Sequence, residues 1–535
     1  MKPFLPFLCC GLSLSALAGA AGKERWVYLP ANFQVDAEAD RVIGLLERAA
    51  KVGYTHALVT DSKFSRLETV MPSYRPNVAR VKEAADRLKM EVIPCVYPVG
   101  YSNDLLFHNP NLAEGIPVKD ALFVVSGGEA KVQADPAVSL PGGAMEDRSG
   151  WDFIDDSVVA RDGYLISGPT DSNARIFRRV KVAPWRQYRL SVKIKTQGYS
   201  GSPPEIKALA GEKSLQWTNL KTEATQDWIR QDVTFNSLGH SDVGIYFGVW
   251  GGHQGTLMWD EAFIEETGPV NLLRRPGTPL VIRKDGGAVL KEGSDYEPVT
   301  DPLMGTKPWS GEYTAWHEAP GIRVPRLKDG EKLRVSYYHT AVIHDGQVCG
   351  CVEELEFQKL LRAQAKQVAE LWTAPGHFMS HDEWRVLGWD RACGKGKTPG
   401  QIAAANARMC TSNLKEIAPG KRILVWSDVF DPHHNAVKEY YLVNGSLEGS
   451  WEGLSPEVEV MNWNFGKRSE SLAFFSKRGH SQLIAGYYDD AIANVVAWLD
   501  AAKDTEKVKG FMYTTWRNDY SKLEEVAGIL ADKGW

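Results

Sequence analysis

The stretch HFMSHDEW, residues 377–384, is an apolar run that ends in two adjacent carboxylates, Asp382 and Glu383. Neighbouring acids repel each other and lose hydration when a site closes around them, so a purely structural role would be costly. Later runs have the same form, apolar first and then aromatic or polar. They are residues 422–428, 458–463, 483–489 and 510–516. This repetition predicts the rim of a barrel, where the carboxyl ends of strands carry the reactive side chains.

Strand and helix patterns alternate at both ends of the chain. Before residue 105, strand patterns at 25–29, 55–61 and 91–97 are separated by helical patterns at 36–52 and 77–89. This spacing predicts parallel strands with right-handed crossovers. Alternation resumes with a helix over 353–372, after which the run at 377–384 is the fourth strand and four more follow. The fold class is therefore α/β, a (β/α)8 TIM barrel interrupted by an all-β insertion.

Between about residues 110 and 340 the helical periodicity gives way to short alternating segments separated by Gly, Pro, Asn and Asp. This pattern is typical of a β-sandwich, and residues 137–268 look like a jelly-roll carbohydrate-binding module. The run at 334–339 also reads as a strand. We assign it to a connector, with Tyr338 and His339 lining the barrel site as the alternative. The predicted divisions are 1–20 (signal peptide), 21–108 (barrel), 137–268 (sandwich), 269–344 (connector) and 345–535 (barrel).

Composition points to a sugar ligand rather than a polyanion. The net charge of -5 and the absence of a basic stripe with interleaved aromatics disfavour nucleic acid. The 18 Trp and 19 Tyr offer many flat faces on which sugar rings stack. We therefore expect a glycan or glycoside as the partner, while the sequence leaves the oligomeric state open.

The amino terminus carries one basic residue, a short apolar core and small residues around Ala18 and Ala20. These features predict a secretory signal cleaved near either alanine, and the segment is too short to span a bilayer. We expect a secreted or periplasmic protein without membrane insertion.

Cleavage would leave an odd set of cysteines without the paired spacing of a zinc site. They are Cys95, Cys349, Cys351, Cys393 and Cys410. Cys393 and Cys410 could form a disulfide, although sequence does not fix the geometry that this requires. We expect no metal and no cofactor.

Three segments resemble glycoside hydrolase family 20, the β-N-acetylhexosaminidases: Asp382–Glu383, residues 423–431 (ILVWSDVFD) and residues 512–516 (MYTTW). The resemblance implies that Glu383 is the general acid/base and that Asp382 holds the substrate's 2-acetamido group, which acts as the nucleophile. The chain departs from the family in having Ser380–His381 where His-x-Gly-Gly is typical. It also lacks a clear counterpart of the early Arg that grips the sugar hydroxyls.

Further candidates for substrate binding lie near the carboxyl ends of the predicted strands. They are His381, Trp426, Asp428, Trp463, Tyr487, Tyr488, Asp489 and Trp516. The tryptophans are either pocket wall or core, and strand register decides which tyrosine faces inward. Asp489 either touches substrate or caps the next helix. His381 is a candidate for tuning the neighbouring acids.

The predicted function is a secreted, exo-acting β-N-acetylhexosaminidase with substrate-assisted retaining catalysis. One alternative is a retaining glycosidase in which Asp428 or Asp489 acts as a protein nucleophile together with Glu383. Another is a carbohydrate-binding surface protein without activity. A further reading of the acid pair is a solvated carboxylate pair at a helix entry.

Overall fold

The computed structural model describes residues 22–394, 396–489 and 491–535. The predicted signal peptide, residues 1–20, lies outside these residues. Among the residues described, no helix is both long and apolar enough to cross a membrane.

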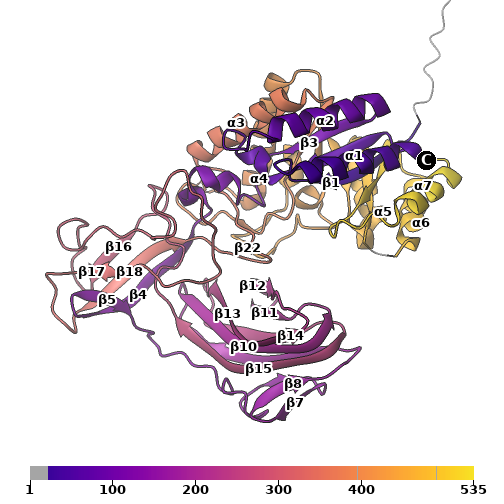
Figure 1. The fold of residues 1–535 in the computed structure, drawn as a ribbon. Helices are drawn as coiled ribbons and strands as arrows, with labels where there is room; N and C mark the ends of the chain where they lie inside the picture. Colours follow the sequence, from indigo (N-terminus) through magenta and orange to yellow (C-terminus); the bar gives the residue numbers. More distant parts are fainter. Residues whose placement is uncertain (1–21, 395, 490) are drawn as a thin grey trace, which may run out of the picture.

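In the described chain, eight parallel strands form a closed barrel, which confirms the predicted fold class (Figure 1). The strands in order are β1 (Glu24–Pro30), β2 (His56–Thr60), β3 (Glu91–Val96), β19 (Gly376–Met379), β21 (Arg422–Trp426), β23 (Glu459–Asn462), β24 (Gln482–Tyr488) and β25 (Val508–Thr514). The strand that precedes the acid pair, β19, is the fourth and pairs with β3 and β21. The barrel is therefore interrupted after its third strand.

Helices cover the outside of the barrel, and amphipathic ones such as α1 turn an apolar stripe inward. In α1, for example, Ala39, Val42 and Leu46 are buried against the strands. The others are α2 (Tyr74–Leu88), α3 (Leu355–Trp372), α4 (Pro399–Ile417), α5 (Arg468–Lys477), α6 (Ala493–Ala502) and α7 (Leu523–Asp532), with α1 spanning Asp36–Lys51. Helix α4 begins with a capping box between Thr398 and Gln401.

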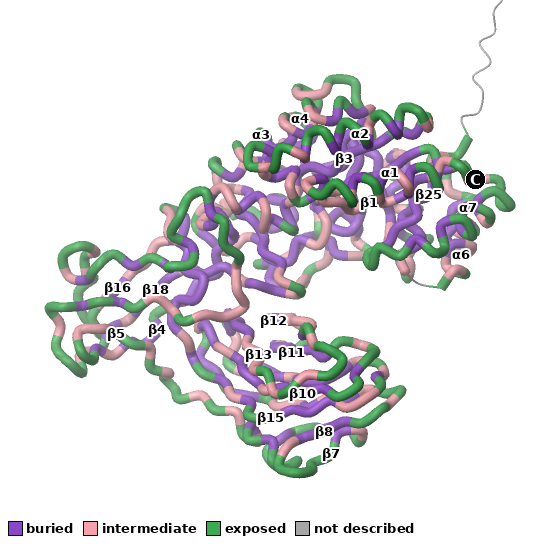
Figure 2. Tube along the Cα trace, in the orientation of Figure 1, coloured by how far each residue is buried: buried purple, intermediate pink, exposed green. Residues whose placement is uncertain are grey.

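Two layers of core follow from the alternation of side chains along each strand. Inward-facing residues such as Trp26, Phe378 and Met461 form one buried cluster inside the barrel. Outward-facing residues join the helices in a larger cluster, and the tube in Figure 2 is correspondingly buried along the strands and exposed along the outer helices.

The insertion contains two five-stranded antiparallel sheets, as the sandwich pattern predicted. One is formed by β13 (Gln226–Asn236), β10 (Gln187–Gly201), β15 (His253–Glu266), β8 (Tyr164–Ser167) and β7 (Val158–Arg161). The other is formed by β12 (Lys213–Asn219), β11 (Glu205–Ala210), β14 (Asp242–Val249), β9 (Ala174–Lys181) and β6 (Phe153–Ile154). The sandwich meets the barrel side at β22 (Leu442–Val443), where Lys213 Nζ lies 3.2 Å from the Val443 carbonyl.

A separate five-stranded sheet is formed by strands that precede the sandwich in the sequence and strands that follow it. Its order is β16 (Val281–Lys284), β18 (Lys332–His339), β4 (Ile116–Ser126), β5 (Glu129–Val132) and β17 (Ile322–Arg323). The run at 334–339 therefore belongs to this connector sheet and not to the barrel. The His339 ring is buried beside Gln187 and Asn236, away from the barrel rim.

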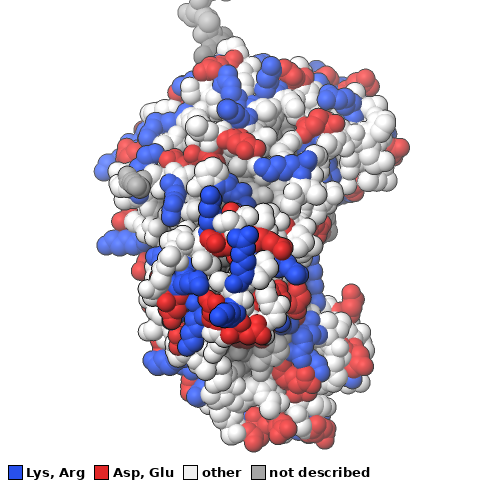
Figure 3. Space-filling model, turned by 90° about the vertical axis from the view of Figure 1, so that its left-hand side faces the viewer, with Lys and Arg blue, Asp and Glu red and all other residues white. Residues whose placement is uncertain are grey.

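Charge is mixed over the surface. On the face drawn in Figure 3, Lys and Arg alternate with Asp and Glu across both the barrel side and the sandwich. Many charged side chains of the described chain form ion pairs, and some of these are exposed, such as Arg87 with Glu47. Exposed pairs of this kind stabilise a fold only weakly.

Candidate active site

A cavity of about 580 Å³ opens at the carboxyl ends of the barrel strands. Its lining comes from most of the strands and from the loops that follow them. Among the lining residues are Tyr28, Thr60, Val96, Tyr101, Asp382, Glu383, Trp426, Trp463 and Trp516. The cavity therefore lies where the reacting groups of this barrel class are found.

A sharp turn brings both acids of the pair into this cavity. Strand β19 ends at Met379, and Glu383 has a φ of +49°, in the left-handed region. In an extended chain Asp382 and Glu383 would point to opposite sides. Such a backbone costs a non-glycine residue about 1–3 kcal/mol and persists only when its surroundings hold it. The Glu383 N–H donates to Asp428 Oδ2 at 2.7 Å, and Gln347 Nε2 donates to the Glu383 carbonyl at 2.8 Å.

The Glu383 carboxylate is held by a buried cation. Arg385 Nη2 lies 2.7 Å from Glu383 Oε1, and the Arg385 side chain is only 3% exposed. The Tyr101 hydroxyl donates to Glu383 Oε2. Arg385 also donates to Gln347 Oε1 at 2.7 Å and to the Tyr101 hydroxyl at 3.1 Å. Glu383 is thus fixed from two sides, by a guanidinium and by a phenol.

Gly100 allows the loop that carries Tyr101 to approach the acid pair. A Cβ at Gly100 would lie 2.0 Å from the Asp382 carbonyl oxygen. Only a glycine fits between these two backbone segments, because real Cβ contacts are much longer. The Gly100 carbonyl accepts a hydrogen bond from Gln347 Nε2 at 2.9 Å, which ties the same loop to the connector.

Asp382 lies in a less polar environment than Glu383. Its Oδ1 accepts a hydrogen bond from Ser380 Oγ at 2.8 Å. Burial raises the pKa of Asp382 to about 7, and the nearby carboxylates of Asp428 and Glu383 add to the increase. Asp382 can therefore gain or lose a proton near neutral pH.

Asp428 does not line the cavity but holds the backbone of the acid pair by a hydrogen bond. It is fully buried, and burial raises its pKa to about 7. Besides the Glu383 N–H, its carboxylate accepts hydrogen bonds from Asn435 Nδ2 at 2.8 Å and from Trp463 Nε1 at 3.4 Å. Its oxygens are committed to holding the turn at Glu383.

Aromatic side chains form one wall of the cavity. The ring centroids of Trp426 and Trp516 are 6.1 Å apart, and those of Tyr28 and Trp516 are 5.4 Å apart. Trp426 is buried, whereas Trp516 is 52% exposed. An exposed indole beside two acids is a surface on which a sugar ring can stack. Trp463 lines the cavity too, with the His434 ring against it at 4.5 Å.

The structure does not bring Tyr487 to the cavity. The β24–β25 register shifts between Ala485 and Tyr487, which reverses the alternation of side chains. The Tyr487 ring consequently stacks on Tyr513, with centroids 4.6 Å apart, on the helix side of the sheet. The side chain of Tyr488 lies outside the described residues.

Asp489 and His381 lie behind the cavity wall. Asp489 accepts hydrogen bonds from Thr515 Oγ1 at 2.6 Å and from the Trp516 N–H at 2.7 Å, so it holds the loop that carries Trp516. The His381 ring faces α4, with Nε2 3.0 Å from Asn406 Oδ1. Burial lowers the pKa of His381 to about 4, so this ring is neutral at pH 7.

Sequence reasoning missed Arg385, Tyr101 and Gln347. The signal for Arg385 was a basic residue two positions after the acid pair, and Tyr101 follows β3 at the same rim. Gln347 comes from the chain that returns to the barrel, and nothing in its local sequence points to the site. In the described chain, one group of side chains is close enough to hold a metal ion: Glu114, Cys351, Asp390 and Cys393. None of these four is among the residues that line the cavity.

No protein-family model and no curated protein matches this chain. Among solved structures, a rhamnosidase from Novosphingobium sp. PP1Y is similar at 10% identity and a TM-score of 0.34, covering 96% of this chain and 59% of that one. A GH20 exo-β-N-acetylglucosaminidase from Vibrio harveyi is similar at 14% identity and a TM-score of 0.26, covering 36% and 33%. A family 4 carbohydrate-binding module is similar at 18% identity and a TM-score of 0.19, covering 24% and 85%.

Proposed function

We propose that this chain is a glycoside hydrolase that releases a terminal β-linked N-acetylhexosamine, with Asp382 and Glu383 as its reacting carboxyls. The observation that carries the proposal is the turn at Glu383, which directs both acids into one cavity beside Trp426 and Trp516. Glycoside hydrolysis needs a proton donor at the leaving oxygen and a group that stabilises the oxocarbenium-like centre. Two acids in unlike environments beside a stacking surface supply both functions.

The other carboxylates near the cavity already accept hydrogen bonds, which favours a mechanism in which the substrate supplies its own nucleophile. A conventional retaining enzyme needs a second free carboxylate across the sugar. The carboxylates of Asp428 and Asp489, the two candidates for that nucleophile, already accept hydrogen bonds from backbone and side-chain donors. Asp61, which follows β2 at the same rim, accepts from the Phe33 and Lys63 N–H groups and from the Tyr74 hydroxyl. The substrate's own acetamido oxygen would then be the nucleophile.

In this mechanism Glu383 donates a proton to the leaving oxygen while the acetamido carbonyl oxygen attacks the anomeric carbon. Asp382, as a carboxylate, accepts a hydrogen bond from the acetamido N–H and stabilises the positive charge that develops there. Water then attacks the anomeric carbon of the cyclic intermediate, and Glu383 takes the proton from it.

The test uses chromogenic aryl glycosides with the full chain and two variants. Glu383→Gln should abolish turnover of an aryl N-acetylhexosaminide, and Asp382→Asn should cause a large loss specific to acetamido sugars. Circular dichroism and thermal unfolding check that both variants fold. Full activity of Glu383→Gln would refute the assignment, and glycan binding without hydrolysis of any glycoside would identify a binding protein instead.

A second candidate is a retaining glycosidase with the two roles exchanged. Arg385 Nη2, 2.7 Å from Glu383 Oε1, could orient that carboxyl for attack on the anomeric carbon, while the pKa of Asp382 near 7 suits a proton donor. A 2-deoxy-2-fluoro glycoside with a good leaving group would then label Glu383, detectable by peptide mass spectrometry. Tight inhibition by an N-acetylhexosamine thiazoline, without labelling, would favour substrate assistance.

A further inference from the structure

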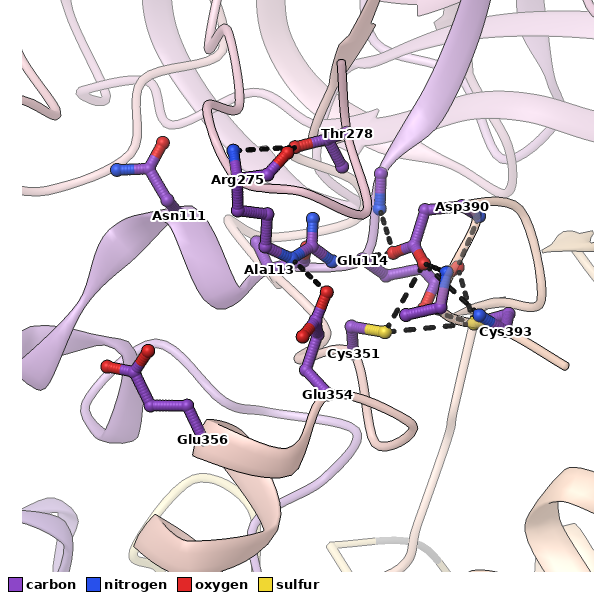
Figure 4. Close-up of polar contacts among 12 residues, drawn as sticks. Asn111, Ala113, Glu114, Arg275, Thr278, Cys351, Glu354, Glu356, Asp390 and Cys393 are labelled. Carbon is purple, nitrogen blue, oxygen red and sulfur yellow. Dashed lines mark hydrogen bonds and ion pairs between the residues drawn. The ribbon is translucent and has the colours of Figure 1, made fainter.

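Four side chains with metal-binding atoms meet at the junction between barrel and connector (Figure 4). Glu114 lies just before β4, where the chain leaves the barrel, and Cys351 lies just before α3, where it returns. Asp390 and Cys393 lie in the loop between β20 (Val386–Leu387) and α4. One donor atom from each lies within 4.8 Å of all the others. Three segments that are distant in sequence are thus joined at one point.

Three distances between the donor atoms are close to the edges of a zinc tetrahedron. Cys351 Sγ and Cys393 Sγ are 3.7 Å apart, Cys351 Sγ and Asp390 Oδ1 are 3.6 Å apart, and Cys393 Sγ and Glu114 Oε2 are 3.3 Å apart. Tetrahedral zinc, with Zn–S of about 2.3 Å and Zn–O of about 2.0 Å, requires S–S edges of about 3.8 Å and S–O edges of about 3.5 Å.

Each carboxylate also uses its second oxygen as a metal-binding carboxylate normally does. Asp390 Oδ2 accepts from Arg275 Nη2 at 2.6 Å, while Oδ1 faces Cys351. Glu114 Oε1 accepts from the Trp389 N–H at 2.7 Å, and both Glu114 oxygens lie 3.3 Å from Cys393 Sγ. Asp390 Oδ1 also accepts from the Ala392 N–H at 2.9 Å, so backbone and side-chain donors fix both carboxylates beside the thiols.

Burial makes a cation at this point favourable. Glu114 and Cys351 are fully buried and Asp390 is 4% exposed. Burial, followed by the charge of Asp390, raises the pKa of Glu114 to about 8. Two acids packed together away from water are costly unless a positive charge accompanies them. Arg275 pairs with Asp390 on the outer side and leaves the space among the four donors to a second cation.

We propose that Glu114, Cys351, Asp390 and Cys393 bind one zinc ion with a structural role. Two thiolates select a borderline-soft ion such as Zn²⁺ over Mg²⁺ or Ca²⁺, which prefer oxygen ligands alone. Four protein ligands complete the coordination, and a closed site of this kind is structural rather than catalytic. The expectation of no metal rested on sequence spacing, and the ligands here come from three segments that no local spacing connects.

The site holds the loop that follows the acid pair. Arg385, the partner of Glu383, lies five residues before Asp390 and is joined to it through the short strand β20. Thiols bind zinc as thiolates, so zinc affinity should rise with pH.

The first experiment measures metal in the full-length protein, purified under reducing conditions with zinc in the medium and then dialysed. Mass spectrometry of the elements should find one zinc per chain in the wild type. A Cys351→Ser/Cys393→Ser double variant should retain almost none, whereas Cys349→Ser, two positions from Cys351 and outside the four ligands, should retain the full amount. Zinc retained by the double variant, or its absence from the wild type, would overturn the proposal.

The second experiment uses only the wild-type protein. Wild-type protein with cobalt in place of zinc should show a thiolate-to-cobalt charge-transfer band in the near ultraviolet and the visible bands of tetrahedral cobalt. A spectrum of octahedral, oxygen-bound cobalt would contradict the proposed ligands. Peptide mapping that finds Cys351 and Cys393 joined as a disulfide in the purified wild type would also overturn the proposal.

Discussion

Replacing Arg385 with Met should destabilise the barrel and disable the site together. The substitution keeps an unbranched apolar stem and removes the 2.7 Å ion pair with Glu383 and the 2.7 Å hydrogen bond to Gln347. Breaking a buried ion pair costs about 3–5 kcal/mol. Because the Glu383 side chain is 24% exposed, solvent screens part of the interaction and we take about 3 kcal/mol.

The orphaned Gln347 oxygen adds about 1 kcal/mol, for a total of about 4 kcal/mol and a fall in the Tm of the barrel of roughly 5–10 °C. Arg391→Met, an exposed position in the same loop, is the control and should lie within about 0.5 kcal/mol of wild type. Arg385→Lys should recover only part of the loss, because an ammonium cannot reproduce the guanidinium fork. Equal unfolding temperatures for Arg385→Met and Arg391→Met would refute the reasoning.

Four further outcomes follow from the geometry. Because Asp382 must be ionised to accept the acetamido N–H, and its pKa is raised to about 7, kcat/KM should fall about tenfold per pH unit below that value; a flat profile from pH 5 to 8 would contradict this role. Trp516→Ala should raise KM about tenfold, equivalent to ~1.4 kcal/mol, without a change in Tm, since the indole is half exposed. Gly100→Ala should cost about 1–3 kcal/mol of stability through overpacking against the Asp382 carbonyl, and unaltered thermal unfolding would argue against that contact. Arg422→Met should lower stability by about 3 kcal/mol, because Arg422 joins Glu459 at 2.8 Å and Glu24 at 3.0 Å at the opposite end of the barrel, yet kinetic assays should find kcat unchanged.

The fold was predicted mainly from the spacing of apolar residues along the sequence. Strands and helices of the barrel differ in the spacing of apolar residues, and the loss of helical spacing after residue 110 marks the insertion. Strands joined by parallel crossovers lie next to each other in the order of the chain. The strand before the acid pair could therefore be identified as the fourth, although the insertion separates it from the third. These features are local in sequence, so they were accessible without a structure.

The arrangement of the rim was less accessible because it depends on single-residue shifts and on distant contacts. One register shift in β24 moves Tyr487 to the outer side of the sheet. The alternation of apolar residues in the sequence does not predict this shift. The left-handed turn at Glu383 depends on Asp428 and Gln347, which lie on other segments. The four proposed zinc ligands come from distant segments: the whole insertion separates Glu114 from Cys351, and α3 and β19 separate Cys351 from Asp390. Their spacing therefore resembles no local motif.

The insertion helps to build the catalytic face that it interrupts. Gln347, in the chain that returns from the connector, donates to the carbonyls of Gly100 and Glu383 and accepts from Arg385. One amide therefore joins the loop after the third strand to the turn after the fourth, the two strands between which the insertion lies. An uninterrupted barrel would lack this bridge, and the strained backbone at Glu383 would lose one of its two restraints. The position of the interruption, between the third strand and the helix that leads into the strand with the acid pair, thus has a physical consequence for the orientation of both carboxyls.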